Sequence, residues 1–272
     1  GGRFLFEHGR IPDRSFFSFL EPPRFRVDYF WLFRACVYWI FSWSGYYGLI
    51  VLRALACAVT LALVARFLFR AKPTRPPHMW LAFLAVGSFI VLLPRQMLVR
   101  PHLFSYAFMI LFLYVLEYHP RRVIWLPWVA VLWCNVHGIT FPVLLLICMA
   151  YGLDAVLRGV TGRRDPERSG PRYMNPLMLC MGAMFVTPHG LKLLALPSQS
   201  LSYLAHFVNE LKPFSFADLL RFEVVGLSPN QWSVFNVFFW VTCLAILESV
   251  VTMRARFCHL LLCFGALCLM TQ

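Results

Sequence analysis

The segment 95–102 carries the clearest candidate chemistry in the 272-residue chain. It places two guanidinium groups, at Arg95 and Arg100, and one imidazole, at His102, just before a long apolar segment. A guanidinium binds an oxyanion through two parallel hydrogen bonds, so these side chains suit a phosphate group. The alternative interpretation is that the arginines anchor a helix end at a membrane surface.

Two histidines occur in His-Gly pairs that interrupt apolar segments. His137 lies in Asn135-Val136-His137-Gly138, and His189 lies in Thr-Pro-His-Gly. A histidine at a helix break can bind a ligand, and it can equally hydrogen-bond carbonyl groups that the break leaves unpaired. A repeated break is also typical of transporters with an internal duplication. Asn135, His137 and His189 are therefore candidate substrate-binding residues, with both interpretations open.

Two carboxylates are candidates for a general base. Asp28 and Glu210 each lie among apolar residues close to an expected membrane segment, where loss of water can shift a pKa. The other acids fit solvated loop charges better. The sequence has no P-loop, GxSxG or HExxH motif, and its nine cysteines lack the spacing of a metal pair. No metal-ligating residues are predicted, and the sequence does not specify a cofactor or a metal requirement.

The composition determines the class of protein expected. The chain is 60% apolar, 17% aromatic and only 14% charged. Soluble domains are about 25% charged, and disordered chains have low hydrophobicity, so both classes are excluded. The net charge of +13 is spread in short clusters between apolar segments. This pattern favours the positive-inside rule of membrane proteins over nucleic-acid binding.

The apolar segments predict an all-α, polytopic helical bundle that forms a single transmembrane domain over 1–272. We expect eight membrane passages, several of them short or broken, at 46–69, 79–93, 103–118, 123–134, 139–157, 174–186, 234–251 and 259–270. The aromatic-rich segment 29–43 is typical of a helix lying at the membrane surface. Residues 1–45 then form an outer loop with an interfacial helix, and 187–233 forms another outer loop.

The distribution of Lys and Arg predicts the orientation. The loops richest in these residues are 66–78, 119–122, 158–172 and 252–258, which are therefore expected to be cytoplasmic. The loops that then face outward together are 1–28, 94–102, 135–138 and 187–233. The orientation thus predicts that Asp28, His102, His137 and His189 lie at the same outer end of the bundle.

Six short motifs along the chain share one resemblance. They are EHGRIPD at 7–13, FFSF at 16–19, VDYFWL at 27–32, RPHLF at 100–104, LWCNVHG at 132–138 and VNELKP at 208–213. Together they resemble bacterial polytopic membrane proteins related to GT-C fold glycosyltransferases, a group similar to protein mannosyltransferases and aminoarabinose transferases. The sequence Thr-Pro-His-Gly at 187–190 departs from the Asn-Pro-Tyr-Gly usual in that group.

The resemblance implies transfer of a sugar from a polyprenyl-phosphate donor to an acceptor at the outer face of the bacterial inner membrane. It implies an outer-loop carboxylate as base, with Arg100 and His102 as partners of the donor phosphate. The key Asp of such enzymes follows a first spanning helix upstream of these motifs. We therefore expect Asp28 to support that residue, and the chain to be a fragment lacking that helix and its C-terminal part.

Two other functions remain open at this stage. A transporter would explain the broken helices and the paired His-Gly turns. A structural membrane subunit without chemistry is a third possibility, which the outward cluster of polar groups disfavours. The expected partners are the polyprenyl-phosphate sugar donor and membrane lipids, with no nucleic acid. The donor sugar, the acceptor and the oligomeric state are not specified by the sequence.

Overall fold

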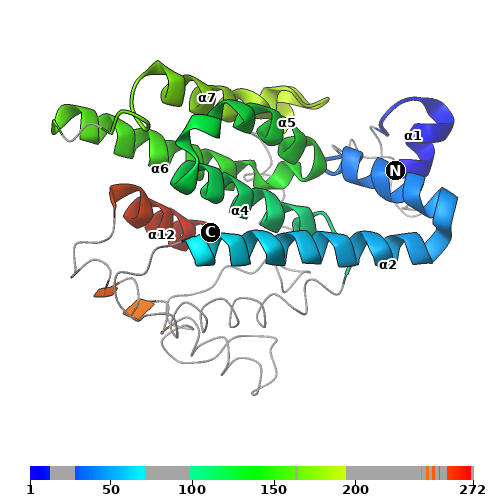
Figure 1. Ribbon diagram of the computed structural model, residues 1–272. Coiled ribbons are helices and arrows are strands. Elements are labelled where there is room, and N and C mark those ends of the chain that lie inside the picture. Colours follow the sequence, from blue (N-terminus) through cyan, green and yellow to red (C-terminus); the bar gives the residue numbers. More distant parts are fainter. Residues whose placement is uncertain are drawn as a thin grey trace.

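The described part of the protein consists of α-helices and short 3-10 turns (Figure 1). The computed structural model describes residues 1–12, 28–70, 98–162, 165–193 and 256–270, and six positions between 240 and 251. The α-helices are α1 (Gly2–His8), α2 (Trp31–Arg70), α4 (His102–Tyr118), α5 (Leu126–Val136), α6 (Phe141–Val160), α7 (Pro171–Gly182) and α12 (Phe257–Met270). The 3-10 turns are η1 (Pro120–Trp125), η2 (Gly138–Thr140), η3 (Ala183–Phe185) and η4 (Gly190–Leu193). No strand occurs in these ranges.

A sharp kink divides α2 into two helices. Gly45 has φ 58° and ψ −147°, a conformation that residues with a Cβ atom rarely adopt. The aromatic-rich residues before the kink and the apolar residues after it run in opposing directions (Figure 1). The predicted boundary between an aromatic helix at 29–43 and a passage at 46–69 is therefore confirmed.

The core of the bundle lies among α4, α5, α6 and α7. Its fully buried large side chains come from different helices and include Phe112, Trp133, Leu144 and Tyr173. The second half of α2 packs along α4, and α12 packs on α6. At the last contact, a Cβ atom on Gly265 would lie only 2.3 Å from Cδ1 of Leu146, so the missing side chain permits the close approach.

The predicted break between α5 and α6 is present. A single helix over 123–157 would be about 52 Å long, too long for a ~30 Å hydrocarbon core. In the structure α5 ends at Val136, His137 leaves the helical conformation with φ −146°, and α6 begins after the short turn η2. Pro142 lies in the first turn of α6, where its missing N–H costs no intrahelical hydrogen bond.

Two elements differ from the expectation. Residues 1–28 were predicted as a loop, but α1 forms there, with an ion pair between Arg3 and Glu7 (2.7 Å) and a left-handed C-cap at Gly9. The helix expected at 174–186 begins earlier, at Pro171, and finishes in η3. Proline favours the first helical position, because a backbone N–H there has no intrahelical partner and proline lacks one.

Two helical segments are long and apolar enough to cross a membrane, Trp31–Leu68 and Gly138–Val160. Because Gly45 turns the chain, only the part of α2 after it forms a straight candidate span. This supports association with a membrane by length and composition. Helices also lie at the predicted passages in 103–118, 123–134, 174–186 and 259–270. The passage at 79–93 lies outside the described residues, and that at 234–251 lies largely outside them.

Candidate functional site

One end of the bundle brings together segments that are distant in the sequence. The residues just before α2 contact the break between α5 and α6, where the Gly138 N–H donates to the Tyr29 carbonyl (2.9 Å). They also contact the turn after η3, where His189 Nε2 donates to the Asp28 carbonyl (3.0 Å). We call the polar groups at this end the polar end cluster, which consists of Asp28, Arg34, Ser105, Asn135, His137 and His189.

Asp28 is buried, and both of its carboxylate oxygens have partners. Oδ2 accepts a hydrogen bond from Nη1 of Arg34 (2.9 Å), and Oδ1 accepts one from the Phe30 N–H (3.2 Å). Arg34 lies in the first turn of α2 and is about one-third exposed. Asp28 therefore holds Nη1 of a partly exposed guanidinium, which suits a positioning role better than that of a base.

Asn135 joins three elements through its side-chain amide. Its Oδ1 accepts the indole N–H of Trp31 (2.9 Å). Its Nδ2 donates to the carbonyls of Val131 (2.8 Å) and Val186 (3.0 Å). Both amide hydrogens are therefore used inside the protein, and Asn135 fastens the start of α2 and the end of η3 to α5.

His137 is buried in a hydrogen-bonded group on α4 and α5. Its Nδ1 lies 2.6 Å from Oγ of Ser105, which also accepts the indole N–H of Trp133 (2.9 Å). Burial, and after it the charge of His102, lowers the pKa of His137 to about 3. The imidazole is therefore neutral at physiological pH, and its bond to Ser105 fixes its orientation.

His189 hydrogen-bonds the carbonyl of a distant segment and not one that its own helix break leaves unpaired. Its Nε2 donates to a backbone carbonyl, and its ring lies 6.4 Å from that of Tyr29. Burial lowers the pKa of His189, while the hydrogen bond to the carbonyl of Asp28 and the charge of that residue oppose the shift. This histidine thus ties the turn at 187–190 to the segment before α2.

Arg100 and His102 lie where α4 begins. The Arg100 carbonyl accepts the Leu103 N–H (3.1 Å), and Arg100 is exposed just before the helix that carries Ser105. The ring of His102 packs edge-on against Tyr106 (5.7 Å), and His102 is close enough to His137 to affect its pKa. Arg95 and Glu210 lie outside the described residues.

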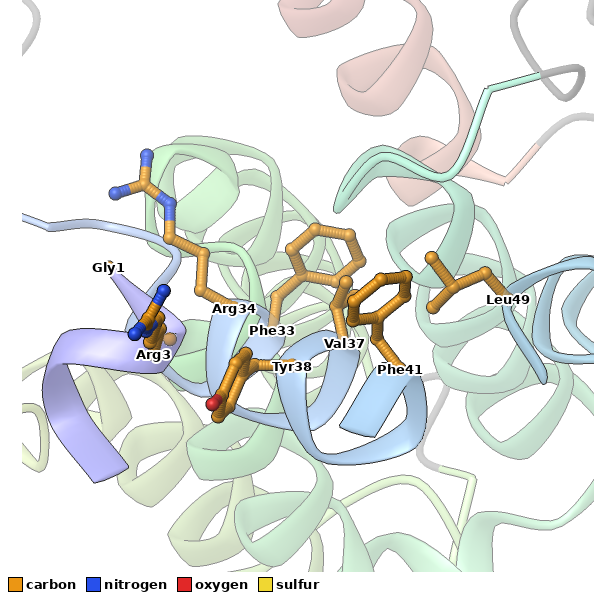
Figure 2. Close-up of a pocket in the computed structure, with 9 residues that line it drawn as sticks. Gly1, Arg3, Phe33, Arg34, Val37, Tyr38, Phe41 and Leu49 are labelled. Atoms are coloured by element: carbon orange, nitrogen blue, oxygen red, sulfur yellow. The ribbon is translucent and has the colours of Figure 1, made fainter. Parts of the chain in front are cut away.

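A pocket of about 270 Å³ opens beside the polar end cluster, between α1 and the two halves of α2. Its lining residues are Gly1, Gly2, Arg3, Phe33, Arg34, Val37, Tyr38, Phe41 and Leu49. Figure 2 shows the apolar side chains grouped on one side and the guanidinium groups of Arg3 and Arg34 on the other. The pocket thus combines an apolar wall with two guanidinium groups, each of which also pairs with a carboxylate, Arg3 with Glu7 and Arg34 with Asp28.

Sequence reasoning missed a second cluster of ionic groups, at the opposite end of α4. Oε1 of Glu117 accepts hydrogen bonds from Arg256 and from the hydroxyl of Tyr151 (2.5 Å), and Arg168 donates to the Glu117 carbonyl. The sequence signal was a carboxylate in the last turn of an expected membrane passage, which usually has a partner in the bundle. Its partners come from two of the Arg-rich loops and could not be identified from spacing.

The same cluster contains three possible metal ligands. One ligand atom each from Glu117, Cys258 and His259 lies within 4.8 Å of the others, although the sequence had predicted no metal site. Arg256 already forms an ion pair with the Glu117 carboxylate. A cation there would have to displace a guanidinium, so this arrangement fits an internal ion-pair network better than a metal centre.

Comparisons with protein-family models, with curated proteins and with solved structures gave no match. The class defined by the described part of the chain is therefore an all-helical protein with two candidate membrane-spanning helices. Its distinctive site is the polar end cluster with the adjacent cationic, apolar pocket.

Proposed function

We propose that the protein is a multi-pass inner-membrane enzyme that transfers a sugar from a polyprenyl-phosphate donor to an acceptor at the outer face. Such a reaction needs a site for an anionic lipid, cations for the departing lipid phosphate and a base for the acceptor hydroxyl. The single observation that supports the proposal most is the apolar pocket flanked by Arg3 and Arg34 next to the polar end cluster.

In this proposal the isoprenoid chain of the donor occupies the apolar wall formed by residues such as Phe33 and Phe41. Arg34 binds the phosphate, and the ion pair with Asp28 fixes its guanidinium. Arg100, at the start of α4, provides a further cation. The proposed base is a carboxylate of an outer loop, for which Glu210 is the candidate.

The alternative, a transporter, finds less support. A transporter of the inverted-repeat type has its polar groups on broken helices near the bilayer midplane. Here His137 lies at the end of α5, and His189 lies in the turn after η3. Both contact the segment that precedes α2, through the ring contact of Phe30 with His137 (5.3 Å) and the bond of His189 to Asp28. His137 and His189 thus lie at helix ends, which is not the arrangement expected of an inverted-repeat transporter.

The proposal is tested by binding and turnover with the purified full chain in detergent. Binding of polyprenyl phosphate is compared with that of polyprenol, which has the same chain without the phosphate. Arg34→Lys keeps the charge but loses the planar fork, so the affinity for polyprenyl phosphate should fall about tenfold or more. Arg100→Lys should also weaken binding. Arg121→Gln is the control, because that exposed arginine pairs with Glu167 (2.6 Å) at the opposite end of α4.

Turnover is measured as release of polyprenyl phosphate from a panel of polyprenyl-phosphate sugars in the presence of an acceptor extract. Release that Arg34→Lys reduces and Arg121→Gln leaves unchanged supports the proposal. Equal affinity for polyprenyl phosphate and polyprenol, or unchanged binding in both Arg34→Lys and Arg100→Ala, rejects it. Vectorial uptake of a solute without any release of lipid phosphate would favour the transporter instead.

A further inference from the structure

A second cationic site lies at the end of the bundle opposite the polar end cluster. There the hydroxyl of Tyr114, on α4, accepts hydrogen bonds from Nε of Arg66 (2.9 Å) and Nη1 of Arg70 (3.2 Å). Nε2 of His119 lies 3.2 Å from the same oxygen. One buried phenol oxygen therefore collects two guanidinium groups and an imidazole, while both arginines remain exposed.

This site has an excess of positive charge. Among the residues that the structure describes, neither Arg66 nor Arg70 forms an ion pair with a carboxylate, and the same holds for Arg122 in η1. Glu117, on the same helix as Tyr114, pairs its carboxylate with Arg256 and Arg168 instead. Within the described part of the protein, the hydrogen bonds of Arg66 and Arg70 go to the Tyr114 hydroxyl, and no carboxylate neutralises either charge.

The charges of Arg66, Arg70 and Arg122 all affect the same imidazole, that of His119. Burial lowers the pKa of His119, and the charges of Arg70, Arg122 and Arg66 lower it further, in that order. Like charges that lie this close repel one another and are held together only when the fold or an anion compensates. Here the phenol of Tyr114 is the structural partner, since the guanidinium of Arg66 also lies 5.9 Å over its ring.

We propose that Arg66, Arg70 and Arg122 bind the phosphate of an anionic phospholipid headgroup. The planar guanidinium groups match a phosphate, and Tyr114 orients two of them. Arg66 and Arg70 close the last turns of α2, a candidate membrane span, so the site lies where a spanning helix meets the headgroup region. The inference rests on the membrane location in the proposed function, but it uses none of the residues of the polar end cluster.

The test measures lipid binding by native mass spectrometry of the full chain in neutral detergent. Phosphatidylglycerol and phosphatidylcholine with identical acyl chains are the probes. Loss of two surface arginines should weaken phosphatidylglycerol binding roughly 25-fold, so this is the result expected for Arg66→Gln/Arg70→Gln. Tyr114→Phe keeps the ring and all charges but removes the oxygen that orients the guanidinium groups, and it should cause a smaller loss.

Arg121→Gln is the matched control, because it removes one exposed charge next to Arg122 but from an arginine already paired with Glu167. It should leave the affinity within about twofold. Equal affinity for the two lipids, or an equal loss of affinity per charge in Arg121→Gln, overturns the proposal. Displacement of phosphatidylglycerol by inorganic phosphate at equal concentration also overturns it, since the ligand would then be free phosphate. Arg34→Lys should leave this affinity unchanged, which separates this test from that of the proposed function.

Discussion

Replacement of Ser105 by Ala should destabilise the bundle through loss of buried hydrogen bonds. The Ser105 hydroxyl accepts the indole N–H of Trp133 (2.9 Å) and contacts Nδ1 of His137 (2.6 Å), with Oγ1 of Thr140 more distant (3.4 Å). Ser105, Trp133 and His137 are all buried. Because water cannot readily replace the hydroxyl, the variant leaves the indole donor and the imidazole nitrogen without partners.

The expected magnitude follows from the number of groups left unpaired. A buried polar group without a partner costs about 1–3 kcal/mol in soluble proteins. In membrane proteins a side-chain hydrogen bond contributes about 0.6 kcal/mol on average, because the unfolded state in the membrane also finds partners. Two strong bonds are lost here, and the cavity left by one oxygen is small. We therefore expect Ser105→Ala to lower the free energy of unfolding by about 2 kcal/mol.

The assay is reversible unfolding of the purified protein in mixed micelles with increasing SDS. Ser42→Ala is the matched control, because its exposed hydroxyl donates only to the Trp39 carbonyl of its own helix (2.7 Å), and it should change stability by less than about 0.5 kcal/mol. A double-mutant cycle with Trp133→Phe should give a coupling energy of about 1 kcal/mol. If Ser105→Ala is as stable as Ser42→Ala, the hydrogen-bonded group does not hold α4 to α5 and the reasoning fails.

Three further outcomes are expected. Gly265→Leu should destabilise the contact of α12 with Leu146 by about 1–3 kcal/mol in the same SDS assay, and an unchanged midpoint would exclude that close approach. Since His137 titrates near pH 6.5 when unfolded and about 3 when folded, the free energy of unfolding should fall by about 2 kcal/mol from pH 8 to pH 5. His137→Gln should lack that fall, and an identical pH dependence in the variant would contradict the assignment. In a cysteine-free background, a membrane-impermeant thiol reagent added outside should label a cysteine at position 200 and not one at Gly162, whereas the reverse pattern would invert the proposed topology.

The sequence predicted the breaks between helices better than their packing. The turn at His137-Gly138 ends a helix as expected, because glycine and the following Pro142 oppose helix continuation. The kink at Gly45 lies between the two segments expected at 29–43 and 46–69, although the residue itself had not been singled out. The charge of the loops also indicated that the segment before α2 and the turns at 135–138 and 187–190 lie at one end. The contacts of Tyr29 and Asp28 with those turns agree with this prediction.

The partners of each polar side chain could be decided only by the tertiary structure. Asn135 was a candidate ligand in the sequence, yet its amide bonds Trp31 and Val186, which lie far from it along the chain. From helical spacing alone, Ser105 shares a face with His102 and Tyr106 that can point into the bundle. Its pairing with His137 depends on how α4 packs beside α5, which no local spacing specifies.

The arginines show the same difference between what the sequence determines and what the packing of the helices determines. The number of arginines near α2 and α4 is a property of the sequence, and it predicted which loops are rich in positive charge. Whether an arginine pairs with a carboxylate depends on distances of a few ångströms between helices. Glu117 thus neutralises Arg256 from a remote loop, whereas Tyr114, three residues earlier on the same helix, collects Arg66 and Arg70. Composition and periodicity therefore determined an all-helical, basic chain, and helix packing alone decided which of the described arginines pair with a carboxylate.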